Sequence, residues 1–472
     1  MQTLNHENLE GQGDEDALTL SPNDHYSNPQ YIGQTNLDVQ TLFKQNASLI
    51  TRQIKVDPAS GLQQKIQQLT TLDVKKMIHE VSADEEGEAQ KLTLQPGARI
   101  IIPNKEPTKC SIKRNGIVRA YAAITNQGLV RTYNEDRVSI ILNITKPSHR
   151  KDEVWPKCSF FGVYDGHGGH NCAEFLRDQL HHFVVKQDCF PQDPREAIVK
   201  GFRKAEETFL QMCQGRDENG NPIVVDRSGS CAIVILIVGD MCYSANVGDS
   251  RAVLSISGGQ IVMPLSRDHK PSDTNEYSRI AQNGGQVYQT TTAQSLEPDT
   301  SARGKSKNSA QPGHYPGDAK TQKWSEPEYV IGPIRVLPGR LSVSRTFGDP
   351  EAKLAYRGGN MNVVKAEPEI RQFRIHKNHD FIMLASDGVY DKMSNEDISR
   401  CVWESCDKNK WQSNPSYRPA QSVHQQCGLA VESVLKNSLY RQSLDNVTVV
   451  MIAFQNFKRQ VFGQGKNSDR DE

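Results

Sequence analysis

The feature that most limits the fold of this chain is a series of short apolar runs, many of them rich in β-branched residues, that lie between residues 159 and 454. They read SFFGVYDG, SCAIVILIVGD, MCYSANVGD, SRAVLSISGG, DFIMLASDG and DNVTVVMIAF. Runs of this length and composition, bounded by Gly and Asp turns, are typical of buried strands. The longest, AIVILIV at 232–238, is far shorter than the roughly 20 residues that a membrane-spanning helix needs.

Tight turns join several of these runs. Gly239-Asp240 connects SCAIVILIVGD to MCYSANVGD, and Gly258-Gly259 ends SRAVLSISGG. Short turns of this composition are typical of hairpins, so we expect neighbouring strands to pair in the antiparallel direction.

Two stretches, 170–185 and 195–213, have apolar residues at helical intervals. Their predicted core stripes are Cys172, Leu176, Leu180 and Phe183 in the first stretch, and Ile198, Phe202, Ala205, Phe209 and Met212 in the second. Because the helices come in pairs rather than one between every two strands, we expect a layered α+β sandwich rather than a doubly wound parallel sheet.

The flanking segments have a different composition. Residues 1–116 are rich in Gln, Asn, Asp and Glu, and we expect a largely disordered extension because such a segment buries little apolar surface. Within it, the near-helical spacing over 62–81 predicts a helix that either binds a docking partner or packs on the rest of the chain. The polar, Pro- and Gly-rich segment 289–330 predicts a long surface insertion, and 456–472 a polar tail.

Charge and cysteine content exclude several classes of function. Lys plus Arg and Asp plus Glu both number 56, so no excess charge indicates a nucleic-acid or membrane partner. The first residues lack the basic and apolar pattern of a secretory signal, and Gln2 stands where N-myristoylation requires glycine. The ten cysteines are scattered, which argues against zinc sites and a disulfide framework. We therefore expect an intracellular protein of the cytoplasm, the nucleus or both.

Four aspartates stand where an apolar run meets a glycine, an asparagine or a turn. They are Asp165 in VYDGHGG, Asp249 in NVGDSR, Asp387 in LASDG and Asp445 in DNVTVV. A single Asp-Gly is most often a simple turn, but four carboxylates at strand ends indicate a hard-cation site. Ligands of this kind, without Cys or His, select Mg²⁺ or Mn²⁺ over zinc. Glu135 and Asp136 in RTYNEDR add a further acidic pair.

These residues belong to motifs that resemble the type 2C, metal-dependent (PPM) family of protein serine/threonine phosphatases. The resemblance covers about 117–455, and its motifs follow the order of that family. They are RTYNEDR, FFGVYDGHGG, SGSCAIVILI, ANVGDSRAVL, RDHKP, LSVSRTFGD, ASDGVYDKMSNEDI and DNVTVVMI.

The resemblance implies a four-layer α-β-β-α sandwich, in which two stacked antiparallel sheets are flanked by helix pairs and a metal pair lies at one end. It implies that Asp165 bridges two Mg²⁺ or Mn²⁺ ions, that the Gly166 carbonyl binds one of them, and that Asp387 and Asp445 bind the other. The segment 289–330 corresponds to the family's flap beside the active site and is longer than usual.

Further acids have expected roles around this pair. Glu135 and Asp136 match the family's supporting acidic pair, with Glu135 acting through metal-bound water. Asp249 matches the acid of a more weakly held third metal, and Asp391 resembles another acid near that position.

The resemblance also implies a catalytic scheme. Arg131 binds the phosphate, and its planar guanidinium suits two phosphate oxygens. A water shared by the two ions attacks the phosphorus in line, and His167 acts as the general acid for the leaving oxygen. Residues expected to orient the ligands and the adjacent loop are Asn446, Ser344, Arg345 and Asp349.

The sequence therefore predicts a monomeric phosphatase that acts on phosphoserine and phosphothreonine in proteins. Two alternatives remain. One is a catalytically inactive relative that works as a binding scaffold through its N-terminal extension. The other is a phosphatase of small phosphoesters, since the same metal chemistry permits both substrates.

Overall fold

The computed structural model describes residues 106–293, 329–407 and 420–463. The chain divides into two units, Met1–Gln90 and Lys91–Glu472, and all described residues lie in the second unit. The helix predicted near 62–81 lies outside the described residues. So do most of the extension 1–116, the middle of the 289–330 insertion and the end of the 456–472 tail.

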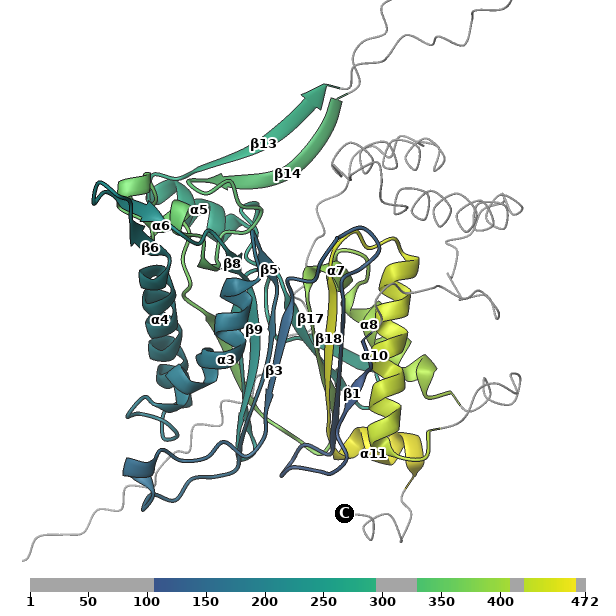
Figure 1. The fold of residues 1–472 in the computed structure, drawn as a ribbon. Helices are drawn as coiled ribbons and strands as arrows, with labels where there is room; N and C mark the ends of the chain where they lie inside the picture. The colour runs from purple at the N-terminus through teal and green to yellow at the C-terminus, as the bar shows by residue number, and fades with distance from the viewer. Residues whose placement is uncertain (1–105, 294–328, 408–419, 464–472) are drawn as a thin grey trace, which may run out of the picture. The chain divides into compact units, whose positions relative to one another are not determined.

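Two antiparallel sheets form the centre of the described region (Figure 1). The first has the order β1-β2-β18-β17-β11-β12, with β1 Lys109–Cys110, β2 Ala120–Asn126, β18 Val447–Ala453, β17 His379–Ala385, β11 Arg251–Ile256 and β12 Ile261–Pro264. The second has the order β16-β10-β9-β4-β3, with β16 Glu369–Arg374, β10 Met241–Val247, β9 Ala232–Val238, β4 Cys158–Tyr164 and β3 Arg137–Ile141. All six predicted apolar runs form strands, and the two predicted hairpins, β9 with β10 and β11 with β12, pair as expected.

Strand β9 shows why its sequence is apolar throughout. Side chains alternate across a strand, and Ile233, Ile235 and Ile237 face the core between the two sheets. Val234 and Leu236 face the other way, against the helices. Both faces are thus removed from water, which explains an uninterrupted apolar run where a sheet with one solvated face would alternate.

Helices cover the outer face of each sheet, which confirms the predicted four-layer arrangement (Figure 1). The second sheet is covered by α3 Asn171–Val185 and α4 Pro194–Met212, and the first by α8 Asn395–Ser405, α10 Val423–Tyr440 and α11 Gln455–Phe462. The prediction that Met212 belongs to the core stripe is wrong, because α4 ends there and the residue is 59% exposed.

Two segment predictions differ from the structure. Residues 456–462, expected to begin a polar tail, lie in α11, because Phe457 and Val461 are buried against the first sheet. The last part of the predicted extension contributes β1, which pairs with β2 at the edge of that sheet.

A smaller group of elements lies beside the second sheet. It contains α5 Thr274–Gln282, β13 Gln286–Ala293, β14 Tyr329–Leu337, α6 Pro350–Lys353 and η3 Ala355–Arg357. Its own small core includes Ile280, Val336 and Val363. The predicted insertion 289–330 differs from the structure at both ends, because β13 continues to Ala293 and β14 begins at Tyr329, and these strands pair as a projecting ribbon (Figure 1).

The remaining elements are short. A small sheet of order β15-β8-β5 joins β15 Phe347–Gly348, β8 Gly229–Ser230 and β5 Gly166–His167. Others are the hairpin β6 Gln214–Arg216 with β7 Pro222–Val224, η1 Ser148–Arg150 and α7 Asp387–Tyr390. In the part of the chain that the structure describes, none of the helices combines the length and apolar character needed to cross a membrane.

The core between the sheets should dominate the stability of this unit. Leu384 in β17 is fully buried there, so Leu384→Ala should lower the free energy of unfolding by about 2–5 kcal/mol, through lost burial and the cavity left behind. Ile261 in β12 is 55% exposed, and Ile261→Ala, the matched control, should cost less than about 1 kcal/mol. Urea unfolding of both variants checks this. Equal costs would contradict the assignment of Leu384 to the core.

Candidate active site

Three carboxylates converge at one end of the sandwich. Asp165 follows β4, Asp249 follows β10, and Asp387 follows β17 as the first residue of α7. One ligand atom of each lies within 4.8 Å of the others. Because β4 and β10 belong to one sheet and β17 to the other, the group exists only where the two sheets are stacked in register.

The electrostatics of this group favour a bound positive charge. The pKa of Asp165 is raised well above its ordinary value, first by burial and then by repulsion from Asp387. Burial and the charge of Asp249 raise the pKa of Asp387 in the same way. Ionised carboxylates this close repel one another in a region of low dielectric. A set of three neighbouring carboxylates fits a hard divalent cation such as Mg²⁺ or Mn²⁺.

A lysine that the sequence analysis did not assign contacts this group. The Lys270 Nζ atom lies 2.5 Å from Asp249 Oδ2, and the thiol of buried Cys231 donates to Asp249 Oδ1 at 3.3 Å. Lys270 belongs to the RDHKP motif, which was recognised without a role for its residues. The motif therefore marked Lys270 as a residue of interest, but its sequence does not indicate which carboxylate the lysine contacts.

Asp445, the fourth predicted aspartate, immediately precedes Asn446 and β18 and is paired differently. Its Oδ2 atom accepts a hydrogen bond from Arg131 NH2 at 2.6 Å. The Arg131 side chain is 49% exposed, so its guanidinium lies at the rim with access to solvent. Asp445 still contributes to the field of the site, because its charge helps to raise the pKa of Asp387.

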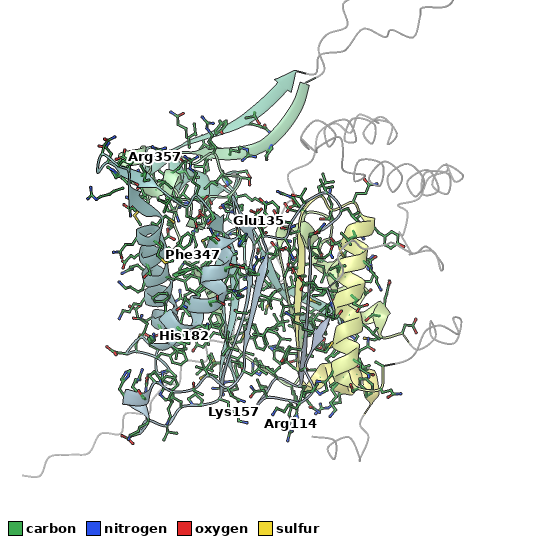
Figure 2. All side chains as sticks on the ribbon, viewed as in Figure 1. Arg114, Glu135, Lys157, His182, Phe347 and Arg357 are labelled. Carbon is green, nitrogen blue, oxygen red and sulfur yellow. The ribbon has the colours of Figure 1, made fainter. Side chains whose placement is uncertain are left out.

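The acidic pair that precedes β3 holds two segments next to the carboxylate group. Glu135, at the upper end of the sheets in Figure 2, accepts a hydrogen bond from Gly169 N at 2.6 Å and so holds the glycine-rich loop. Asp136 is buried and accepts from Ser386 Oγ at 2.9 Å. Burial raises the pKa of Asp136 to about 7, although hydrogen bonds from Thr448 and Ser386 oppose the shift.

Asn446 connects several of these segments. Its Oδ1 atom accepts from Glu135 N at 2.8 Å, and its Nδ2 atom donates to the carbonyls of Gln127 and Tyr133. It thereby holds the segment that carries Arg131 and Glu135.

Gly166 lies in β5, where its backbone passes close to another segment. A Cβ atom at this position would lie 2.6 Å from the Glu135 carbonyl oxygen, so the approach of these two chains requires glycine. Because Gly166 directly follows Asp165, its backbone lies beside the carboxylate group.

His167 and Asp349 form a pair at the edge of the site. The Nε2 atom of His167 lies 2.9 Å from Asp349 Oδ2. Burial alone would lower the pKa of His167, but the Asp349 carboxylate outweighs burial, and the pKa of His167 is raised. The same pairing lowers the pKa of Asp349. His170, by contrast, is the N-cap residue of α3, which agrees with the expectation that it opens that helix.

The other predicted residues are Asp391, whose charge helps to raise the pKa of Asp387, and Ser344 and Arg345. Asp391 is exposed and follows α7 as its C-cap residue. Ser344 Oγ and Arg345 NH2 each donate to Glu276 of α5, both at 2.6 Å. Ser344 and Arg345 thus fasten the loop before β15 to α5 rather than contacting the carboxylate group. Sequence reasoning missed Glu276, because an acid on an amphipathic helix usually faces solvent.

The comparisons with known proteins identify the family. A profile of the family described as "Protein phosphatase 2C" matches residues 124–427, well over half of the 472 residues. The chain belongs to the protein phosphatase 2C family. The matched range contains every predicted site residue except Asp445 and Asn446.

Individual relatives share moderate identity. A probable protein phosphatase 2C 11 from Arabidopsis thaliana is 30% identical over 297 residues, which cover 63% of this chain and 58% of the relative. A probable protein phosphatase 2C 55 from Oryza sativa subsp. japonica is 30% identical over 303 residues, which cover 64% of this chain and 59% of the relative. The chain thus spans less than two thirds of the length of these relatives.

Two solved structures are also similar to this chain. A serine-threonine phosphatase 2C from Toxoplasma gondii is similar with a TM-score of 0.44 at 22% identity, over 74% of this chain and 99% of that chain. A sex-determining protein from C. elegans is similar with a TM-score of 0.49 at 21% identity, over 72% of this chain and 66% of that one.

The raised pKa of Asp387 predicts a stability effect. A carboxyl group whose pKa is higher in the folded state binds more protons there, so without metal the free energy of unfolding should fall as pH rises above about 4. Asp387→Asn removes this penalty. In chelator at pH 7 the variant should melt higher than the wild type, by about 2–4 °C for each kcal/mol relieved, and it should gain less stability from added Mn²⁺.

The matched control is Asp152→Asn, since Asp152 is an exposed aspartate. It should leave the melting temperature unchanged with and without metal. A lower melting temperature for Asp387→Asn in chelator would contradict the electrostatic account of the carboxylate group.

Proposed function

We propose that this protein hydrolyses phosphoserine and phosphothreonine esters in protein substrates, with Mg²⁺ or Mn²⁺ ions held at the end of the sandwich. The observation that carries the proposal is the convergence of Asp165, Asp249 and Asp387 from both sheets within 4.8 Å. Membership of the protein phosphatase 2C family supports the same conclusion.

Two ions per site would be held by Asp165, the Gly166 carbonyl, Asp387 and Asp445, and a weaker third ion by Asp249 and Asp391. The charges of both Asp387 and Asp249 act on Asp165, so Asp165 would share in holding the ions with either of these carboxylates. When bound, the ions would supply activation of water for in-line attack and neutralisation of the phosphoryl oxygens. Glu135 and Asp136 would hold the surrounding loop and the Ser386 segment in place.

Arg131 would bind the phosphate. Its guanidinium lies at the exposed rim and contacts Asp445, so it can exchange this contact for two phosphate oxygens while staying next to the carboxylates. The ion pair with Asp445 holds the arginine near the site before substrate arrives, which reduces the ordering cost of binding.

His167 would protonate the leaving seryl or threonyl oxygen. Asp349 raises the pKa of His167, and the imidazolium form that this favours is the form that can donate. Because Nε2 is bound to Asp349, the proton offered to the leaving oxygen is the one on Nδ1.

The first test is phosphate release from a phosphothreonine peptide by the full chain. Turnover should require Mn²⁺ or Mg²⁺, stop in chelator, and fall at least about 100-fold in Asp387→Asn, because a ligand of the reacting centre is lost. Asp152→Asn should match the wild type. If a folded, metal-loaded wild type releases no phosphate from this peptide, protein phosphatase activity is refuted, and a scaffold or a phosphatase of small phosphoesters takes its place.

The role of Arg131 predicts a different kinetic change. Arg131→Ala should raise KM for the phosphopeptide at least about 10-fold, because a charge-assisted contact to phosphate is removed. Arg177, a partly exposed arginine of α3, gives the control Arg177→Ala, for which KM should not change. Steady-state kinetics in Mn²⁺ measure both, and an unchanged KM for Arg131→Ala would show that the phosphate is bound elsewhere.

A further inference from the structure

A buried ion pair lies outside the group of residues that the proposed reaction uses. Glu206 of α4 is 4% exposed and Lys353 of α6 is 2% exposed, and the Lys353 ammonium donates to Glu206 Oε1. Taking two charges out of water costs about as much as their attraction returns, so such a pair is weak evidence for stabilisation. Its contacts indicate what else it does.

The pair holds both ends of one short backbone segment. Lys353 Nζ donates to the Thr346 carbonyl at 2.7 Å, and Glu206 Oε2 accepts from Gly348 N at 2.9 Å. Between these two anchors lies Phe347, which is labelled in Figure 2. It is fully buried, and its ring lies 5.3 Å from that of Phe202 in α4. The segment 346–348, which contains β15, is therefore fixed to α4 by charge and by packing.

This segment leads directly to Asp349, the residue that contacts His167. Gly348 pairs with Gly229, and Gly229 pairs on its other side with His167. Asp349 follows β15 with φ 52°, and its backbone N–H donates to the Ser228 carbonyl at 3.1 Å. The small sheet β15-β8-β5 thus sets the distance between Asp349 and His167.

Atoms are closely packed around the contact between Asp349 and His167. A Cβ atom at Gly229 would overlap both the Asp349 carboxylate and the Nε2 atom of His167. A small shift of β15 would therefore move the carboxylate relative to the imidazole, and small errors in the position of a reacting group can cost about 100-fold in rate.

We propose that Glu206 and Lys353 are positioning residues for proton donation by His167, acting through β15 and Asp349. This inference rests on the proposed function. In the reaction, a water oxygen forms a new bond to phosphorus and that water releases one proton to solvent. The bond from phosphorus to the seryl or threonyl oxygen breaks, the proton of His167 passes to that oxygen, and a proton from solvent restores His167. The buried pair touches none of these atoms and acts on where the imidazole points.

The dependence on the leaving group separates this role from a general structural one. An alkyl oxygen such as that of threonine is a poor leaving group and needs the proton, whereas the nitrophenolate of p-nitrophenyl phosphate is stable as an anion and needs it far less. A positioning defect should slow the first substrate selectively. A loss of folded protein or of metal would slow both equally.

The experiment compares kcat for a phosphothreonine peptide and for p-nitrophenyl phosphate in the full chain with Mn²⁺. Glu206→Gln keeps an acceptor for Gly348 but removes the charge that holds Lys353. The double variant Glu206→Met with Lys353→Met removes both charges and keeps the volume, so that no unpaired charge is left inside. Both should lower kcat for the peptide at least about 10-fold and kcat for the aryl phosphate less than about 3-fold, since general acid catalysis contributes about 100-fold or more.

Glu196→Gln is the control on the same helix, because Glu196 is exposed and pairs with Lys200 on the surface, and it should leave both values unchanged. Equal losses on the two substrates, unchanged values in the double variant, or a double variant that does not fold would each overturn the positioning role. A wild type inactive on the phosphopeptide would instead refute the proposed function.

Discussion

Mutual repulsion between Asp165, Asp249 and Asp387 is the constraint on which the rest of this structure depends. Three carboxylates within 4.8 Å would separate if their backbones were free, because each ionised group disfavours its neighbours. They stay together because each follows a strand whose position is fixed by a paired sheet. The folded chain thus holds together carboxylates whose repulsion a bound cation would relieve.

The fixed position of these strands comes from burial on both faces of the central strands. The isoleucines of β9 pack against the other sheet while Val234 and Leu236 pack against α3 and α4. A displacement of either sheet would disturb two cores at once. Loops carry the residues proposed to act in catalysis. The His167 loop is held by Glu135, and the segment with Arg131 is held by Asn446. The site is therefore a set of short loops whose ends are fixed and whose side chains face one another.

The sequence was sufficient to predict the strands, the antiparallel pairing and the layer order, because these follow from local periodicity and turns. It also indicated the aspartates, because their position at the ends of apolar runs is visible in the chain itself. It did not reveal that Lys270 would reach Asp249, or that Glu206 would be buried with Lys353. These contacts join residues far apart in sequence, and a charged residue on an amphipathic helix carries no local sign that it will be buried. The prediction that Met212 is buried was wrong because the helical spacing of apolar residues continues beyond the last turn of α4 that touches the core.

The ribbon of β13 and β14 affects where residues can be inserted into this chain or deleted from it. The segment 294–328 leaves from Ala293 and returns at Tyr329, which face each other across the paired strands. Its two ends are thus held together whatever the length between them. By the general loop-closure relation, each doubling of the length of a connection costs only about 0.6 kcal/mol. Sequence can accordingly be gained or lost at this point while the strands that carry the aspartates keep their register.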